Sequence, residues 1–185
     1  MRVWLLTCTT YATWLPGDPR GCVTPVRETR ECQAEHAARV EHDLPGTTYD
    51  GGMPGLRLSA AEAAGTPVYL TPDQAEVAAA QFRETAAYRG WSLLALAVMR
   101  NHFHAVVRVP GDPEPRRLLT DLKAYGTRAL DARFGERPRW WTRGGSKRKL
   151  PDALAVARGV RYVLHKQWCP LVTWPPGEDP GEPRA

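Results

Sequence analysis

The order of apolar and polar positions along the chain predicts three strands. Residues 2–15, RVWLLTCTTYATWL, are rich in β-branched and aromatic residues and end at the turn-forming PGDPRG. Residues 91–110 are mainly apolar, with MRNH near their centre. This stretch is too long for one typical strand. We therefore expect two antiparallel strands there, joined by a tight turn near Met99–Asn101.

Helical spacing of apolar residues predicts three helices, over residues 71–90, 114–135 and 151–168. The first has the clearest boundaries. Thr71 suits the N-cap, Pro72 suits the first helical position, and Gly90 suits the end. Val77 and Phe82 would supply its buried face.

Two further regions are rich in Gly and Pro. Residues 16–66 are too long for an ordinary loop, so they are predicted to be an insertion, with short helical pieces near Cys32–Val40 and Ser59–Ala64. Residues 171–185 contain PPGEDPGEPRA and are predicted to be a disordered tail. The remainder, 1–170, is expected to be one α+β domain, an antiparallel sheet with helices on one face.

Composition excludes several classes of protein. The chain of 185 residues has a net charge of +5, which fits a polyanionic partner without proving one. Its four cysteines show no C-x-x-C spacing, so a zinc ribbon is not expected. No stretch approaches a membrane span, and the N-terminus does not read as a signal peptide. We expect no membrane partner and a cytoplasmic location, associated with the nucleoid.

Two histidines interrupt the second apolar strand, VMRNHFHAVVRV. His102 and His104 are two residues apart, so in a strand they share a face and Phe103 points the other way. Neighbouring imidazoles can bind one divalent cation. The alternative is a pair of ordinary hydrogen-bonded histidines. Two ligands do not complete a metal site, so a third must come from elsewhere.

The last helix offers candidates. Tyr162 and His165 are three residues apart and share a helical face, which Lys166 also borders, while Gln167 is turned further round. A tyrosine beside a cation could attack a phosphodiester and form a covalent intermediate. The alternative for Tyr162 is a packing role in VRYVL.

Basic residues gather in 137–150, RPRWWTRGGSKRKL, around two tryptophans. Such a segment could hold phosphates, and one tryptophan could stack on an unpaired base while its neighbour packs in the core. The candidates for DNA contact are Lys123, Arg137, Arg139, Trp141, Arg143, Lys147, Arg148 and Lys149, with Arg20 and Arg27 as further candidates. The alternative is a solvated basic loop beside a buried tryptophan pair, and for Lys123 a solvated helix face.

These motifs together resemble a known family. MRNHFHAVV resembles the M-x-N-H-x-H strand of the HUH single-tyrosine transposases, LKAYGTRAL their helix that begins with L-K, and VRYVLHKQ their tyrosine helix. RWWTRGGS stands where the family has a tryptophan-containing strand. The long insertion and TWLPGDPRG look most like REP-associated tyrosine transposases and related bacterial proteins. The similarity covers about residues 68–170 and the first strand.

The resemblance implies a ferredoxin- or RRM-like fold and metal-dependent cleavage and rejoining of single-stranded or hairpin DNA. His102 and His104 would be ligands of Mg²⁺ or Mn²⁺, and Tyr162 would form a 5′-phosphotyrosine link. A monomer is favoured, with a homodimer as the alternative.

One position departs from the family pattern. The family has Gln or Asn four residues after the tyrosine as a third ligand, and here that residue is Lys166, whose ammonium has no lone pair. Helical phase favours His165 in its place, with Gln167 as the alternative. The departure also supports a catalytically impaired DNA-binding protein of the same fold, and a metal hydrolase with a structural Tyr162 is a third hypothesis.

Overall fold

The computed structural model describes residues 1–19 and 52–175 and divides into two compact units. One unit comprises residues 1–13 and 67–185, and the other comprises 14–66. The second unit corresponds to the stretch predicted as an insertion, with its start two residues earlier. Each unit is described by itself.

A five-stranded antiparallel sheet forms the larger unit, with strand order β4-β1-β3-β2-β5. The strands are β1 (Arg2–Thr9), β2 (Ser92–Val98), β3 (His102–Val109), β4 (Ser146–Leu150) and β5 (Val172–Trp174). The predicted pair in 91–110 is confirmed as β2 and β3, and the turn between them lies at residues 99–101. The predicted α+β class is also confirmed.

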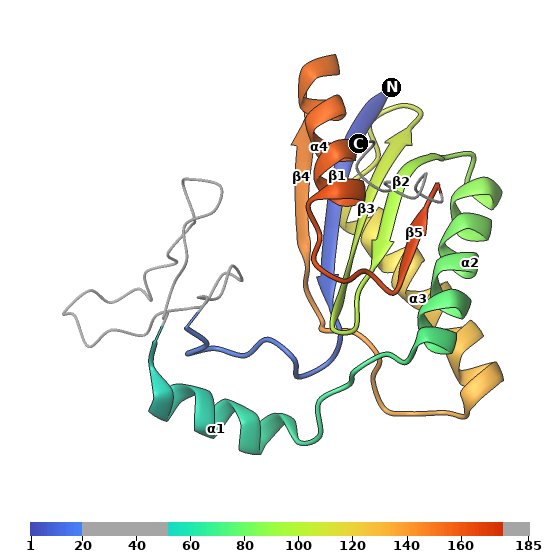
Figure 1. The fold of residues 1–185 in the computed structure, drawn as a ribbon. Helices are drawn as coiled ribbons and strands as arrows, with labels where there is room; N and C mark the ends of the chain where they lie inside the picture. Colours follow the sequence, from blue (N-terminus) through green and yellow to red (C-terminus); the bar gives the residue numbers. More distant parts are fainter. Residues whose placement is uncertain (20–51, 176–185) are drawn as a thin grey trace, which may run out of the picture. The chain divides into compact units, whose positions relative to one another are not determined.

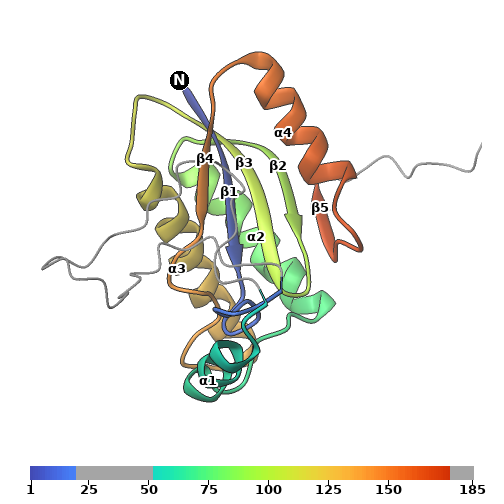
Figure 2. The same cartoon turned by 90° about the vertical axis from the view of Figure 1, so that its left-hand side faces the viewer.

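Helices cover both faces of this sheet (Figure 1, Figure 2). The helices are α2 (Pro72–Tyr88), α3 (Pro115–Phe134) and α4 (Ala153–His165). α2 and α3 pack on one face, and α4 packs on the other. The prediction of helices on one face is therefore wrong. A helix packs on the second face because that face of the central strands is also apolar. Ala95, Ala97 and Val106 lie there and are covered by Val163 of α4.

Side chains on the α2–α3 face form the larger core. Phe82 of α2 and Phe103 of β3 are both fully buried, with ring centroids 4.6 Å apart. Gly126 lets α3 approach closely, because a Cβ at that position would lie 2.7 Å from the Phe82 ring. This packing fixes the side of β3 opposite to the histidines.

Two element boundaries differ from the prediction. β1 ends at Thr9 rather than at residue 15, because the next two amides bond outside the strand ladder: Thr10 N donates to Asn101 O and Tyr11 N to Trp140 O. The predicted disorder from residue 171 is wrong for β5, which pairs with β2 through residues 172–174. Residues 176–185 lie outside the described residues.

The smaller unit contains α1 (Pro54–Ala64), which begins five residues before the helical piece predicted at Ser59. Gly17 packs against the start of α1, where a Cβ would lie 2.4 Å from Met53 O, and its φ of +82° favours glycine. The piece predicted at Cys32–Val40 lies outside the described residues, as do Arg20 and Arg27. In the described part of the chain, no helix has the length and apolar character that spanning a bilayer requires.

The start of α2 gives a prediction about stability. Thr71 Oγ1 accepts a hydrogen bond from Gln74 N, and Gln74 Oε1 accepts one from Thr71 N, so the predicted N-cap forms a complete capping box. Thr71→Ala should lower the free energy of unfolding by about 1 kcal/mol, measured by urea denaturation, because it leaves an amide unpaired. Thr71→Ser keeps the hydroxyl and should restore most of the loss. Equal stability of Thr71→Ala and the unaltered chain would contradict the assignment.

Candidate active site

The two histidines lie side by side on the α4 face of β3. Their ring centroids are 4.9 Å apart, with the planes nearly perpendicular. His104 is buried and His102 is half-buried. Phe103, between them, points into the other core, against Phe82 and Trp141. The alternation of the strand therefore places both imidazoles on one face, as the sequence predicts.

Each imidazole is held through its Nδ1 atom. His104 Nδ1 lies 2.6 Å from Thr7 Oγ1, and His102 Nδ1 lies 2.7 Å from Asn101 Oδ1. Thr7 is the cross-strand neighbour of His104 in β1, so the sheet register brings the two together. When Nδ1–H donates to these oxygens, the lone pair is on Nε2. Such bonds orient metal-binding histidines in many proteins.

The turn before His102 is anchored from two sides. Asn101 O accepts hydrogen bonds from Thr10 N, Thr10 Oγ1 and Thr13 Oγ1, at 2.8, 3.0 and 3.2 Å. Arg100 O accepts one from Leu70 N at 2.7 Å. The backbone that carries the pair is thus fixed before any ligand binds.

Burial keeps His104 neutral. Desolvation, reinforced by the neighbouring His102, lowers the pKa of His104 to about 3, although a side-chain hydrogen bond from Gln167 acts in the opposite direction. A neutral imidazole is the form that binds a metal. His104 therefore needs no deprotonation to act as a ligand at neutral pH.

Tyr162 lies beside the pair. Its ring centroid is 5.2 Å from that of His104, and its side chain is 41% exposed, so it can meet a substrate. α4 is held against the sheet by Val163, which is fully buried, and by Gly159, where a Cβ would lie 2.9 Å from Leu150 Cδ1. Asp152 caps the start of α4 through a 2.8 Å bond from Ala155 N. The last helix therefore brings the predicted tyrosine to the predicted histidines.

The two candidates for a third ligand, His165 and Gln167, lie in different surroundings. α4 ends at His165, and Gln167 lies beyond it, where its Nε2 donates to Tyr162 O at 3.0 Å. The Gln167 side chain is also close enough to His104 to raise the pKa of its imidazole. His165 is exposed, and in residues 1–19 and 52–175 no three His, Cys, Asp or Glu side chains are grouped to hold a metal. The structure thus brings Gln167, and not His165, to the pair.

Helical phase favoured His165 over Gln167 because it was applied past the end of the helix. Lys166 is the C-cap, with φ −117° and ψ 6°, so Gln167 does not follow the 100° rotation per residue of a helix. The chain instead turns back after Lys166, so the Gln167 side-chain amide lies against the last turn of α4, where it is bonded to Tyr162 O. Thr7 and Asn101 are absent from the sequence prediction, since only the β1–β3 register and the turn geometry reveal them.

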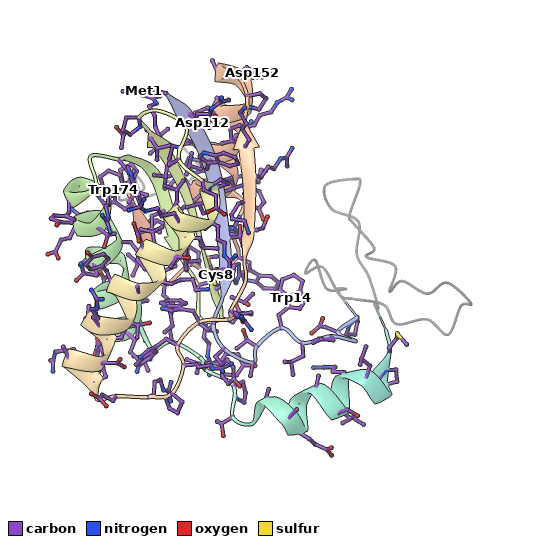
Figure 3. The ribbon with its side chains drawn as sticks, turned by 180° about the vertical axis from the view of Figure 1, so that it is seen from behind. Met1, Cys8, Trp14, Asp112, Asp152 and Trp174 are labelled. Carbon is purple, nitrogen blue, oxygen red and sulfur yellow. The ribbon has the colours of Figure 1, made fainter. Side chains whose placement is uncertain are left out.

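Lys123 is half-buried, and its ammonium is bonded to the backbone of the basic segment. Its Nζ donates to the backbone carbonyls of Thr142, Arg143 and Gly144. Burial lowers its pKa, while the nearby Cys8 acts in the opposite direction. Cys8, labelled in Figure 3, is buried near the same carbonyls, and desolvation raises its pKa to about 11. Lys123 therefore anchors the basic segment, a role that neither the DNA-contact prediction nor the solvated-face alternative gave it.

Both tryptophans of the basic segment are buried, which corrects the prediction that Trp141 is available for stacking. Trp140 and Trp141 are 2% and 5% exposed. Trp140 Nε1 donates to Asp131 at 2.7 Å, and Trp141 packs on Phe82 and Phe103. Trp141 forms an isolated bridge with Thr10, and the strand of this region, β4, begins at Ser146 and contains no tryptophan.

The remaining basic candidates are exposed but do not form one surface. They are Arg137, Arg139, Arg143, Lys147, Arg148 and Lys149. In β4, Arg148 pairs with Leu5, whose side chain belongs to the α4 face, whereas Lys147 pairs with Leu6 of the other face. Directly paired residues share a face. Among the β4 cations, Arg148 is thus on the histidine side of the sheet.

The low pKa of His104 predicts a pH-dependent stability. The unfolded imidazole binds a proton near pH 6.5 and the folded one near pH 3, so stability is complete above about 6.5 and falls as the pH is lowered. In EDTA, the free energy of unfolding should fall by about 2 kcal/mol between pH 8 and pH 5 on this account. His104→Gln should abolish that part of the slope, and the exposed His165→Gln should keep it. If the free energy of unfolding depended on pH equally in the unaltered protein, His104→Gln and His165→Gln, the pH dependence could not be assigned to His104.

Comparison with known proteins gives a likeness in structure. No protein-family model matches the chain, and no curated protein matches it in sequence. The structure is similar to that of a REP-associated tyrosine transposase bound to a REP hairpin, at 12% identity and a TM-score of 0.48, over 88% of this chain and 64% of that one. It is also similar to a protein of Deinococcus radiodurans R1 provisionally described as a transposase, at 13% identity and a TM-score of 0.42, over 88% of this chain and 89% of that one. The chain thus spans less than two thirds of the REP-associated protein.

Proposed function

We propose that this protein is a metal-dependent transposase that cleaves and rejoins single-stranded DNA through a tyrosine. One observation carries the proposal: the rings of His102, His104 and Tyr162 and the Gln167 amide meet on one face of the sheet. They come from β3, α4 and the turn after α4. The motif resemblance to HUH transposases independently assigns the same histidines and tyrosine.

The side chains fit a divalent cation. His102 and His104 would contribute Nε2, and Gln167 would contribute Oε1, because its Nε2 is bonded to Tyr162 O. Two imidazoles and one amide oxygen suit Mn²⁺, and Mg²⁺ is the alternative where water completes its shell. When bound, the cation would stabilise the negative charge that develops on a phosphate oxygen. The neutral state of His104 favours its binding.

In the reaction we propose, Tyr162 Oη attacks phosphorus and the P–O3′ bond breaks. The phosphate becomes linked to the tyrosine at its 5′ side, and the departing 3′ oxygen takes up a proton to become a free hydroxyl. Attack of a 3′-hydroxyl on the phosphotyrosine reverses the step and joins strands. Tyr162 and the histidine pair belong to one chain, which supports a site formed within a monomer.

DNA is the proposed partner, in single-stranded or hairpin form. The exposed cations of the basic segment would neutralise phosphates, and Arg148 would do so on the histidine side. Arg137 lies over Trp140, with Cζ 4.6 Å from the ring centroid, and a guanidinium stacked on a ring keeps its N–H edge available for phosphate. A REP-like hairpin is the proposed substrate by resemblance of the motifs.

A non-catalytic DNA-binding protein is the second candidate. Lys166 occupies the position at which the family has its third ligand, and the described residues hold no group of three His, Cys, Asp or Glu ligands. This candidate predicts hairpin binding that is unaffected by a chelator and by Tyr162→Phe.

Covalent trapping separates the two candidates. Incubation with a hairpin-bearing single-stranded oligonucleotide and Mn²⁺ should give a protein–DNA adduct that survives SDS electrophoresis. Tyr162→Phe should abolish the adduct, and EDTA should prevent it. Tyr88→Phe is the matched control, since Tyr88 is an exposed tyrosine on α2, on the other face of the sheet. The enzyme proposal would be contradicted if the adduct persisted in Tyr162→Phe, or if no adduct formed with any substrate. Hydrolysis without an adduct, lost in His104→Ala alone, would favour the third hypothesis.

Metal titration tests the ligand set without relying on activity. Gln167→Ala should weaken Mn²⁺ binding about tenfold or more in calorimetry, the scale on which metal sites respond to lost support. His165→Ala should bind Mn²⁺ like the unaltered protein, because His165 is exposed and outside the group. If His165→Ala weakened Mn²⁺ binding and Gln167→Ala did not, His165 would be the third ligand instead.

A further inference from the structure

A second site lies between α3 and the segment 138–143. It is an open pocket of about 640 Å³. Its wall includes Thr120, Ala124, Thr127, Arg128, Arg139 and Arg143. The volume lies within the range of ligand sites in proteins. None of the predicted catalytic residues contributes to it.

The charged groups of this pocket are all cationic. Arg128, Arg139 and Arg143 are exposed, and no Asp or Glu is among the described residues that line the wall. The fourth cation, Lys123, already donates to three backbone carbonyls. Three arginines therefore line an open cavity without a carboxylate in its described wall, which favours an anionic ligand.

Aromatic rings orient two of these guanidinium groups. Arg128 lies over Tyr125 at 5.0 Å, and Arg139 lies over Tyr11 at 5.4 Å. A guanidinium stacked on a ring keeps its N–H edge available for two parallel bonds to a phosphate. The threonines of the wall add hydroxyl groups that can donate to or accept from a sugar or a base.

The pocket is connected to the histidine pair through Thr142. Thr142 lines the pocket, and its Oγ1 accepts a hydrogen bond from Thr9 Oγ1 at 2.9 Å. Thr9 is the cross-strand partner of His102. Arg143 follows Thr142 directly. The end of β1 therefore lies between the histidine pair and the segment that carries Arg139 and Arg143.

We propose that this pocket binds one unpaired nucleotide of the DNA strand engaged at the active site, with its phosphate on Arg128, Arg139 and Arg143. The inference rests on the proposed function and adds to it a specific subsite for the single strand. A free nucleotide has the same chemistry, so the experiment distinguishes the two sources.

Binding in EDTA isolates the subsite from catalysis. The affinity of the full chain for a fluorescent 20-nucleotide single strand is measured by anisotropy at several salt concentrations. Arg128→Ala should weaken binding about fivefold and reduce the salt slope by about 0.7, the value for one phosphate of a single strand. Arg133→Ala is the matched control, because Arg133 is exposed on the same helix but does not line the pocket. It should leave both quantities unchanged.

A volume change tests the pocket itself. The double substitution Ala124→Leu with Thr127→Leu fills the cavity without altering charge, and it should weaken binding to a similar degree. Both positions are on α3 outside the buried core, so folding should persist, as circular dichroism would verify. Unchanged binding by this variant, or equal losses in Arg128→Ala and Arg133→Ala, would show a diffuse charge effect and overturn the proposal.

Two further questions can be answered separately: whether the pocket binds a free nucleotide, and whether the subsite and the tyrosine chemistry fail independently. Deoxyadenosine monophosphate at 1 mM should not displace the oligonucleotide. Calorimetric binding of deoxyadenosine monophosphate that is lost in Arg128→Ala, with oligonucleotide binding unaffected by that variant, would assign the pocket to a free nucleotide and overturn the strand proposal. If covalent trapping failed while Arg128→Ala and the cavity-filling variant still weakened oligonucleotide binding, the result would count against the tyrosine chemistry and not against the subsite. Trapping with Arg128→Ala binding unchanged would count against the subsite alone.

Discussion

The register of β1 against β3 is the constraint on which the rest of the site depends. It places Thr7 opposite His104 and Thr9 opposite His102. A slip of one residue would turn every side chain of β1 to the other face, and Cys8 would stand where Thr7 bonds the imidazole. The register is protected by burial, because Leu6 and Cys8 lie in the α2–α3 core while Leu5 packs on the α4 side. The same β1–β3 register is therefore required both for the packing of the core and for the orientation of the histidines.

Local periodicity predicted the parts of the fold and the site that depend on neighbours in sequence. The β2–β3 pair and the shared face of His102 and His104 follow from strand phase, and the Thr71 cap follows from local residue type. The approach of Tyr162 depends in addition on the packing of α4 on the second face of the sheet. Gln167 could not be predicted this way, because the end of α4 at His165 breaks the phase. Thr7 is 97 residues from His104, so its role requires the register.

Composition misled where burial decides the role of a residue. The basic segment suggested that Trp141 and Lys123 contact DNA, yet Trp141 is in the core and the Lys123 ammonium is bonded to carbonyls. A lysine that leaves water loses hydration, and three carbonyl acceptors offset much of that loss. The same bonds satisfy carbonyls at residues 142–144, which lie outside any strand or helix. Charge density in a sequence therefore does not separate cations that bind a ligand from cations that hold the backbone.

The segment that carries the exposed arginines is fixed from both sides. Lys123 bonds its carbonyls from α3, and Thr142 N and Oγ1 donate to Thr9 O and Thr10 O. At its end, Gly145 approaches β1 so closely that a Cβ would lie 2.7 Å from Thr7 O. Thr7 in turn holds His104. The backbone of the proposed DNA contacts and the orientation of a proposed metal ligand thus depend on the same end of β1, so a change at Gly145 would disturb both together.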